Sequence, residues 1–211
     1  MSTCRKAAWR SARCTKWPAA EAARSTALPL HSLPPGSQRG PGGRVLWCVT
    51  RQDLFAPALA AAGLAPDRVI YVEAGDDKAV LACFEEALRH SKLGAVVAEV
   101  SRLSMIASRR LQLAAEGSGV IGLALRPWRR QAEAAEFRQP TAATTRWRVS
   151  ALPSTPLPVP GVGRARWRLE LVRCRRGESA EFEVEACDAQ GQLALSPELA
   201  YRPGRATRAR A

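Results

Sequence analysis

The sequence predicts an α/β fold with a parallel sheet in its middle and an antiparallel extension towards its C-terminus. Short apolar runs alternate with amphipathic segments over residues 44–126, and such uninterrupted runs are typical of parallel strands buried on both faces. Three later segments alternate polar and apolar residues instead, as strands with one buried face do. With 211 residues, 46% of them hydrophobic, the chain is large and apolar enough to form a packed core.

The first expected strand covers residues 44–50 and is continuously apolar from Val45. A helix follows, for which Asp53 is the expected N-cap, and Pro57 falls in its first turn, where a missing N–H is tolerated. Gly63 ends this helix, and residues 67–72 form the second expected strand.

The next elements repeat this alternation. Asp76 and Asp77 open a helix, because a carboxylate at a helix N-terminus stabilises it. Its apolar stripe consists of Val80, Leu81, Phe84, Ala87 and Leu88. Residues 95–100 form the third strand, Ser101 is the expected cap of the next helix, and residues 120–125 form the fourth strand. This order indicates a parallel sheet with right-handed crossovers.

Period-2 patterns in residues 145–150, 166–171 and 181–186 predict three antiparallel strands. Their apolar face consists of Trp147, Val149, Trp167, Leu169, Leu171, Phe182 and Val184. The opposite face presents Arg146, Arg148, Arg166 and Arg168 alongside Glu181, Glu183 and Glu185. Cross-strand pairing would account for several of these arginines, at about 0–1 kcal/mol for each exposed pair.

The net charge of +13 lies in the two ends of the chain, since residues 45–126 are neutral overall. Residues 1–43 are predicted to be a disordered basic tail rich in Pro and Gly. A transit peptide and a start site placed upstream of the true domain are the alternatives for this segment. Residues 44–201 form the predicted domain, with loops at 127–144 and 152–163, and residues 202–211 form a second basic tail.

Two groups of residues are candidates for a site. Glu99 ends a buried strand, where α/β folds place metal-binding acids, but without a phosphate loop we favour a structural role, in which it caps the next helix or pairs with an arginine. Arg126, Arg129, Arg130 and Arg138 follow the fourth strand close to Trp128, and a basic loop with an aromatic residue suits single-stranded nucleic acid. Biased coding is the alternative explanation for the abundance of arginine, since only four of the 32 basic residues are lysines.

The sequence lacks the motifs of several enzyme classes. It contains no phosphate-loop motif and no C-x-x-C pair, and no G-x-G-x-x-G fingerprint follows the first strand. It has only two histidines, His31 and His90, and no evident nucleophile–base pair. We therefore expect no enzyme activity, no cofactor and no metal. Cys48, Cys83 and Cys187 are expected to be small apolar fillers. With neither a transmembrane segment nor a signal peptide in the sequence, a cytoplasmic location is expected.

Several stretches resemble the ImuA family, whose members are RecA-like proteins of the bacterial damage-inducible mutagenesis cassette. The resemblance covers about residues 44–201, and its motifs lie at residues 45–48, 53–64, 72–76, 99–103, 108–119, 144–149, 163–171 and 185–188. The most specific run leads from Glu99-Val100-Ser101-Arg102-Leu103 into Ser108-Arg109-Arg110-Leu111.

The resemblance implies a RecA-like sheet and a role as a partner in lesion bypass. The implied partner is an ImuB-like polymerase-related protein, with RecA and single-stranded DNA as further candidates. Glu99 falls where RecA-like ATPases keep an acid at the end of a strand, whereas Arg51-Gln52 replaces their catalytic Glu. Residues 1–44 stand in the place of the phosphate-loop strand without matching it. The expected function is thus a non-catalytic accessory protein of SOS-induced translesion synthesis. The alternatives are an inhibitor of RecA filaments or another self-assembling protein, a DNA-binding module and an ATPase.

Overall fold

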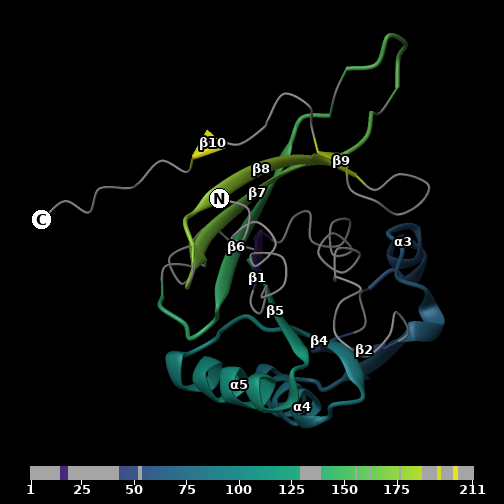
Figure 1. Ribbon diagram of the computed structural model, residues 1–211. Coiled ribbons are helices and arrows are strands. Elements are labelled where there is room, and N and C mark those ends of the chain that lie inside the picture. Colours follow the sequence, from purple (N-terminus) through teal and green to yellow (C-terminus); the bar gives the residue numbers. More distant parts are fainter. Residues whose placement is uncertain are drawn as a thin grey trace, which may run out of the picture.

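A sheet of parallel and antiparallel strands runs through the computed structural model, with two long helices along one face (Figure 1). The structure describes residues 15–18, 43–51, 54–128, 139–154, 156–161, 163–175, 177–186, 194–195 and 202–203. The elements in chain order are β1 (Thr15–Pro18), β2 (Arg44–Val49), α3 (Ala56–Ala61), η1 (Pro66–Arg68), β3 (Val69–Glu73), α4 (Asp77–Arg89), β4 (Leu93–Glu99), α5 (Met105–Ser118), β5 (Ile121–Trp128), β6 (Thr145–Leu152), β7 (Arg166–Cys174), β8 (Ala180–Glu185), β9 (Ala194–Leu195) and β10 (Arg202–Pro203).

The topology confirms the predicted α/β class. Across the described part of the sheet the strand order is β10-β8-β7-β6-β1-β5-β4-β2-β3, with β9 beside β8. Strands β2 to β5 are parallel and are connected through α3, α4 and α5. Strands β6, β7 and β8 form the predicted antiparallel extension.

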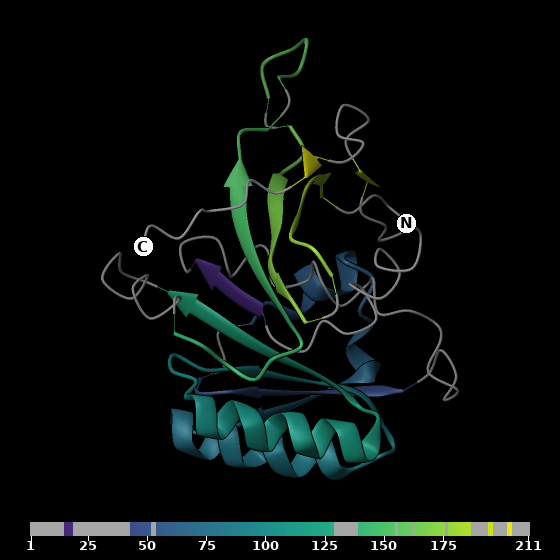
Figure 2. The ribbon, with the colours of Figure 1, turned by 60° about the vertical axis from the view of Figure 1, so that its left-hand side comes forward.

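The parallel strands bury both of their faces, and each face has its own core. On one face Cys48, Val96 and Ala98 pack against α4 and α5, where Phe84 and Leu88 are almost fully buried. Figure 2 shows these two helices side by side beneath the parallel strands. This arrangement confirms the predicted apolar stripe of α4, in which Leu81 is the partly buried member.

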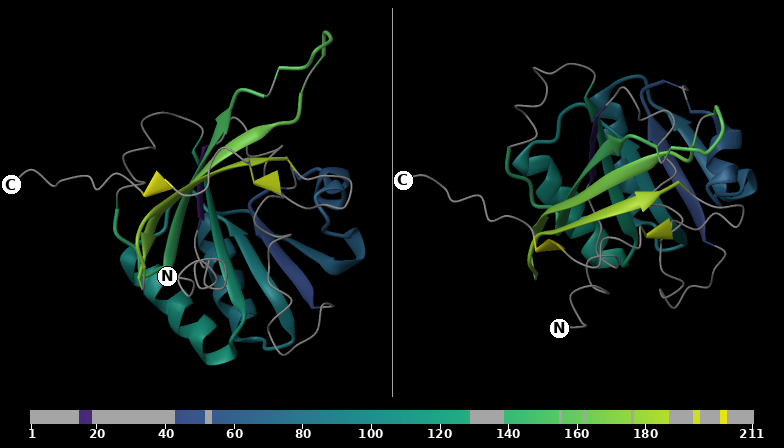
Figure 3. Two further views of the ribbon diagram at one scale, coloured as in Figure 1. Left: turned by 45° about the horizontal axis from the view of Figure 1, so that its top comes forward. Right: turned by 90° about the horizontal axis from the view of Figure 1, so that it is seen from above.

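The antiparallel strands cover the other face of the parallel strands. Trp47, Val97 and Leu123 point to this side and share a core with Trp147 and Leu169. Figure 3 shows the antiparallel strands twisting away from β2–β5 and crossing above them. The same core includes the remaining predicted inward residues of β6–β8, which are Val149, Trp167, Leu171, Phe182 and Val184. The two parts of the curved sheet therefore pack against each other, and Leu59 of α3 belongs to the core between them.

Parts of both predicted tails belong to the sheet. β1 lies between β5 and β6, is parallel to both, and so joins the parallel and antiparallel parts. The prediction of disorder was wrong for these four residues, because a run this short carries no measurable periodicity. Arg202 and Pro203, predicted to be in the second tail, pair with β8 as β10. The other residues of 1–42 and 204–211 lie outside the described part of the chain.

Two helix starts also differ from the prediction. The N-cap of α3 is Phe55, which makes no capping side-chain bond, and Asp53 lies outside the described residues. The N-cap of α5 is Ser104, whose Oγ accepts a hydrogen bond from Ala107 N at 3.1 Å. Ser101 was the wrong choice because its hydroxyl donates to the carboxylate of Asp77 instead.

Several other boundaries lie close to the predicted positions. Asp76 caps α4 by accepting a hydrogen bond from Ala79 N at 2.7 Å. Gly119 ends α5 in the left-handed conformation at φ 73°, where glycine carries no steric penalty. The second strand starts at Val69 rather than at 67, because Pro66–Arg68 forms a 3₁₀ turn.

The close approach of Gly43 to β4 gives a stability prediction. A Cβ at position 43 would lie 2.8 Å from Gly94 Cα and 2.9 Å from Gly94 N, and both are backbone atoms. We expect Gly43→Ala to lower the free energy of unfolding by about 1–3 kcal/mol, as overpacking commonly does. The control is Gly117→Ala in α5, where a Cβ meets nothing within 4 Å. This change should be neutral or stabilise by up to about 1 kcal/mol, since Ala is the better helix former. Urea denaturation measures both, and equal effects would contradict the close contact.

Candidate functional site at the carboxyl ends of the parallel strands

The topology places a candidate site where the crossover connections diverge. After β2 the chain passes through α3, on the side of the antiparallel strands, whereas after β4 it passes through α5 on the opposite side. Ligands of open α/β sheets bind in the crevice that such a divergence opens at the carboxyl ends of the strands. The groups of this chain at that edge are Arg51 after β2 and Glu99, Ser101 and Arg102 at the end of β4.

Glu99 is held by the protein itself. Its Oε1 accepts a hydrogen bond from Trp47 Nε1 at 3.1 Å, and the Trp47 side chain is fully buried on the neighbouring strand β2. The sequence suggested that Glu99 caps the next helix or pairs with an arginine, and it did not predict a bond to Trp47. Both residues sit on the face that packs against the antiparallel strands, as the odd-numbered positions of β2 and β4 do. The sequence therefore indicates that Trp47 and Glu99 share a face of the sheet. It does not give the register of β2 on β4, which brings the two side chains into contact.

A second group of hydrogen bonds links three elements at the carboxyl-end edge. Asp77 Oδ2 accepts hydrogen bonds from Ser101 N at 3.0 Å, Ser101 Oγ at 2.7 Å and Arg102 N at 3.2 Å. Arg126 Nε and Nη2 then donate to the carbonyl oxygen of Ser101 at 3.2 and 2.9 Å. The start of α4, the loop after β4 and the middle of β5 are thus cross-linked through Ser101.

The nucleic-acid contact predicted for Arg126 does not agree with its placement. The residue is only 6% exposed, and its guanidinium is directed at Ser101 rather than at solvent. The sequence suggested an exposed loop here, whereas β5 continues to Trp128 and includes Arg126. Arg129, Arg130 and Arg138, the other three residues of that prediction, lie outside the described residues.

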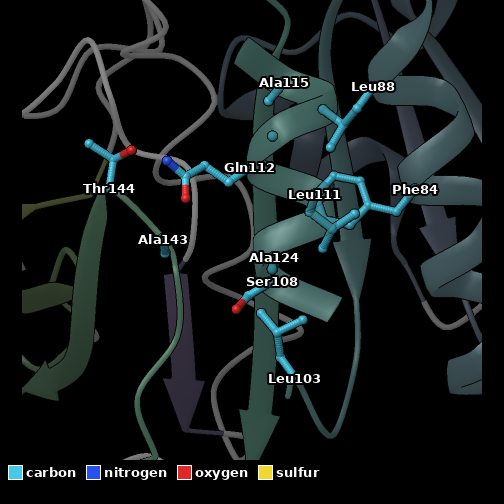
Figure 4. A pocket seen from close by; sticks show the side chains of 11 residues that line it. Phe84, Leu88, Leu103, Ser108, Leu111, Gln112, Ala115, Ala124, Ala143 and Thr144 are labelled. Carbon is cyan, nitrogen blue, oxygen red and sulfur yellow. The ribbon is translucent and has the colours of Figure 1, made fainter. Parts of the chain in front are cut away.

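A small cavity between α5, α4 and β5 is lined mainly by apolar side chains of these elements. Its volume is about 20 Å³, and Ser108, Gln112 and Thr144 are its polar lining residues (Figure 4). Ser108 is already engaged, because its Oγ donates to Met105 O and accepts from Ala142 N, both at 2.9 Å. A space of this size accommodates about one water molecule. The cavity is therefore too small for a nucleotide.

The predicted pairing of arginines with the glutamates of β8 is confirmed for Arg166 and Arg168. Their ion pairs are Arg166–Glu183 at 3.0 Å, Arg168–Glu181 at 2.9 Å and Arg168–Glu183 at 3.4 Å. Arg148 pairs instead with Glu170 of β7, a partner that was not predicted, and its two hydrogen bonds to Glu170 raise the pKa of its guanidinium. These arginines are thus matched by carboxylates and leave little uncompensated charge on this face.

Arg146 is the exception to that outward face. A register shift between Arg146 and Trp147 breaks the alternation at the start of β6. The Arg146 side chain is consequently buried, at 7% exposure, and its Nη2 donates to Thr141 Oγ1 at 2.7 Å. Bulges of this kind leave little trace in a hydrophobic pattern.

The described part of the chain contains neither a metal-binding cluster nor a membrane-spanning helix. No group of three or more His, Cys, Asp or Glu side chains there is arranged to hold a metal ion. No helix among those residues is long and apolar enough to cross a bilayer.

Comparisons with known proteins place the chain in a family. No family model matches it. It is 40% identical over 152 residues to Protein ImuA of Caulobacter vibrioides, in the sequences of both strain NA1000 / CB15N and strain ATCC 19089 / CIP 103742 / CB 15. The chain belongs to the ImuA family. The match covers 70% of this ImuA-family chain and 62% of the relative, so it spans less than two thirds of that protein's length.

A comparison of solved structures found the crystal structure of SulA from Pseudomonas aeruginosa. It is 31% identical to the matched part of this ImuA-family chain, with a TM-score of 0.37. The match covers 41% of this chain and 74% of the SulA chain.

The role of Asp77 gives a prediction on stability. Asp77→Ala removes the acceptor of three hydrogen bonds between α4 and the loop after β4. Because hydrogen bonds to a charged group each contribute about 1.5–3 kcal/mol when buried and less when exposed, we expect a loss of roughly 1–2 kcal/mol. Asp67→Ala, in the exposed 3₁₀ turn, is the matched control and should change stability by no more than about 0.5 kcal/mol. Similar chemical denaturation midpoints for the two variants would argue against the cross-link.

Cys48 gives a prediction on thiol reactivity. Its side chain is fully buried, and burial, reinforced by the nearby Cys83 thiol, raises its pKa to about 12. The thiolate is the reactive form, so at pH 8 the folded chain should leave Cys48 unmodified by iodoacetamide. In urea the same residue should be modified completely. Peptide mass spectrometry distinguishes the sites, and rapid modification of Cys48 in the folded chain would refute the buried placement.

Proposed function

We propose that this ImuA-family chain is a non-catalytic accessory protein of SOS-induced translesion DNA synthesis that acts by binding an ImuB-like polymerase-related protein. The observation that carries the proposal is the 40% identity to Protein ImuA over 152 residues. The ImuB-like partner is the one that the family resemblance implies.

The contacts at the carboxyl-end edge favour a structural role for its charged residues. Glu99 accepts from a buried indole, Asp77 binds two backbone amides and a hydroxyl, and Arg126 binds a backbone carbonyl. A catalytic acid needs a free approach to substrate or metal, whereas these groups are used to hold loops together. The sequence also lacks the glycine-rich phosphate loop with Lys and Ser/Thr that nucleotide hydrolysis requires.

Chromatography of the chain with an ImuB-like protein tests whether the two proteins bind each other. The chain and an ImuB-like protein of the same cassette should elute as one complex in size-exclusion chromatography, at a volume distinct from either protein alone. Circular dichroism first establishes that both proteins are folded. Separate elution of two folded proteins at micromolar concentration would contradict the proposal.

Addition of ATP and Mg²⁺ to the same chain tests whether the chain binds nucleotide, which a non-catalytic protein without a phosphate loop should not do. A ligand at 100 times its dissociation constant stabilises a protein by about 2.7 kcal/mol, which raises the melting temperature of a chain of this size by several degrees. We expect no such shift, and a rise of several degrees would show that the chain binds nucleotide.

A further inference from the structure

The outer side of α5 carries large apolar side chains in solvent. Ile106 is 77% exposed, Leu113 is 53% exposed and Met105 is 46% exposed. Ile106 and Leu113 are seven residues apart and therefore lie on the same side of the helix, two turns from each other. We call these three residues the α5 stripe. The opposite side of the helix packs into the protein through Ser108, Leu111, Gln112 and Ala115. Figures 1 and 2 show that α5 lies at the margin of the molecule, so its outer side is accessible.

Three exposed arginines lie on the side of α5 that contacts the end of β7: one on the helix itself, Arg109, and two outside it, Arg173 and Arg175. Arg109 Nη1 and Arg175 Nη2 both donate to Gln112 Oε1, at 2.9 and 3.4 Å. Arg173 Nη1 donates to Thr141 O at 2.6 Å, next to Ala142, whose N–H donates to Ser108. We call Arg109, Arg173 and Arg175 the arginine seam. It joins α5 to the end of β7, and it lies next to the α5 stripe.

The positive charge of the arginine seam is not neutralised by the described residues. The acceptors that hold its guanidinium groups, an amide oxygen and a backbone carbonyl, are uncharged. None of the ion pairs found within the described ranges includes any of these three arginines. Glu116 accepts a hydrogen bond from the side-chain amide of Gln112 at 2.6 Å. Arg110, on the far side of the stripe, differs because it pairs with Glu85 of α4 at 2.7 Å.

The combination of apolar and positive groups indicates what the surface binds. Exposed apolar side chains bordered by arginine are typical of the centre of a protein interface. Phosphate would match the arginine seam but would leave Ile106 and Leu113 without a partner. Residues 1–44 of this chain carry eight basic residues and one acidic residue, so their charge opposes occupation of this surface. A second copy, in a symmetric contact, would bring arginine seams together.

We propose that the α5 stripe and the arginine seam form the docking surface for an acidic amphipathic segment of a partner protein. This inference rests on the proposed function, under which the partner is the ImuB-like protein. Apolar side chains of the segment cover Ile106 and Leu113, and its carboxylates pair with the guanidinium groups, which neutral acceptors already hold in place. Preorganised groups lose little freedom on binding, which favours affinity.

The affinity of the full-length chain for the ImuB-like protein tests this proposal. We expect Ile106→Ser with Leu113→Ser to weaken binding about 30-fold or more, as loss of central interface side chains does. We expect Arg109→Gln, Arg173→Gln and Arg175→Gln together to weaken binding about tenfold at low salt and to flatten its salt dependence. All five side chains are exposed, so the fold should persist, which circular dichroism checks.

Two control variants remove an exposed apolar side chain and an exposed positive charge from surfaces other than α5. Phe55→Ser removes an exposed apolar side chain, 65% accessible, that precedes α3. Arg89→Gln removes an exposed charge from α4, where Arg89 pairs with Glu85 and Glu86. Both controls should bind the ImuB-like protein within about twofold of the unaltered chain. A control variant that weakens binding as much as the stripe and seam variants would overturn the assignment to α5.

The remaining outcomes separate this inference from the proposed function. If the unaltered chain binds and the stripe and seam variants bind equally well, the docking surface is wrong and the proposed function stands. If the unaltered chain does not bind, the proposed function fails and the inference fails with it. A fluorescent single-stranded 20-mer oligonucleotide serves as the second probe. Loss of oligonucleotide binding in the seam variant, with an unchanged protein complex, would assign the seam to nucleic acid and overturn the proposal.

Discussion

The parallel strands of this chain must be covered on both faces, and the two long helices cover only one of them. Side chains of β2, β4 and β5 alternate between the faces, so that Cys48, Val96 and Ala98 meet α4 and α5 while Trp47, Val97 and Leu123 point the other way. The antiparallel strands supply the missing cover with Trp147, Trp167 and Leu169. Burial of an aromatic or aliphatic side chain contributes about 1.5–3 kcal/mol, so this second core is as necessary to the fold as the first. The curvature of the sheet and the position of β1 between its two parts follow from this requirement.

The same constraint determines what the carboxyl-end edge can do. Trp47 belongs to the second core, and its indole N–H needs an acceptor, which Glu99 provides at the end of β4. Arg126 is buried at the neighbouring strand and is satisfied by the carbonyl of Ser101, which Asp77 in turn holds in place. Glu99, Arg126 and Asp77 thus lie where other α/β proteins bind ligands, but their side chains bond to neighbouring parts of this chain. The exposed arginines Arg109, Arg173 and Arg175, which bond only to uncharged acceptors among the described residues, lie instead on α5 and at the end of β7.

Much of this fold was predictable, because the sequence encodes it locally. Continuous apolar runs revealed β2, β4 and β5, and the i, i+4, i+7 spacing revealed α4. Alternation revealed β6–β8 and their arginine–glutamate pairs. Features that depend on contacts between distant segments were not predictable. β1 and β10 are too short to carry a pattern, the bulge at Arg146 breaks the alternation locally, and the Trp47–Glu99 bond needs the strand register. The arginine seam was missed for the same reason, since Arg109 is more than 60 residues from Arg173 and Arg175.

We propose that the function of this chain resides in the outer surface of α5 and not in its carboxyl-end edge. Hydrogen–deuterium exchange distinguishes the two surfaces when the free chain is compared with the chain plus ATP and Mg²⁺ and with the chain plus an ImuB-like protein. We expect the partner to protect residues 105–118 and 171–175, and ATP to leave exchange unchanged throughout the chain. Protection by ATP at residues 74–78 or 99–103, with no change in α5 on addition of the partner, would contradict it.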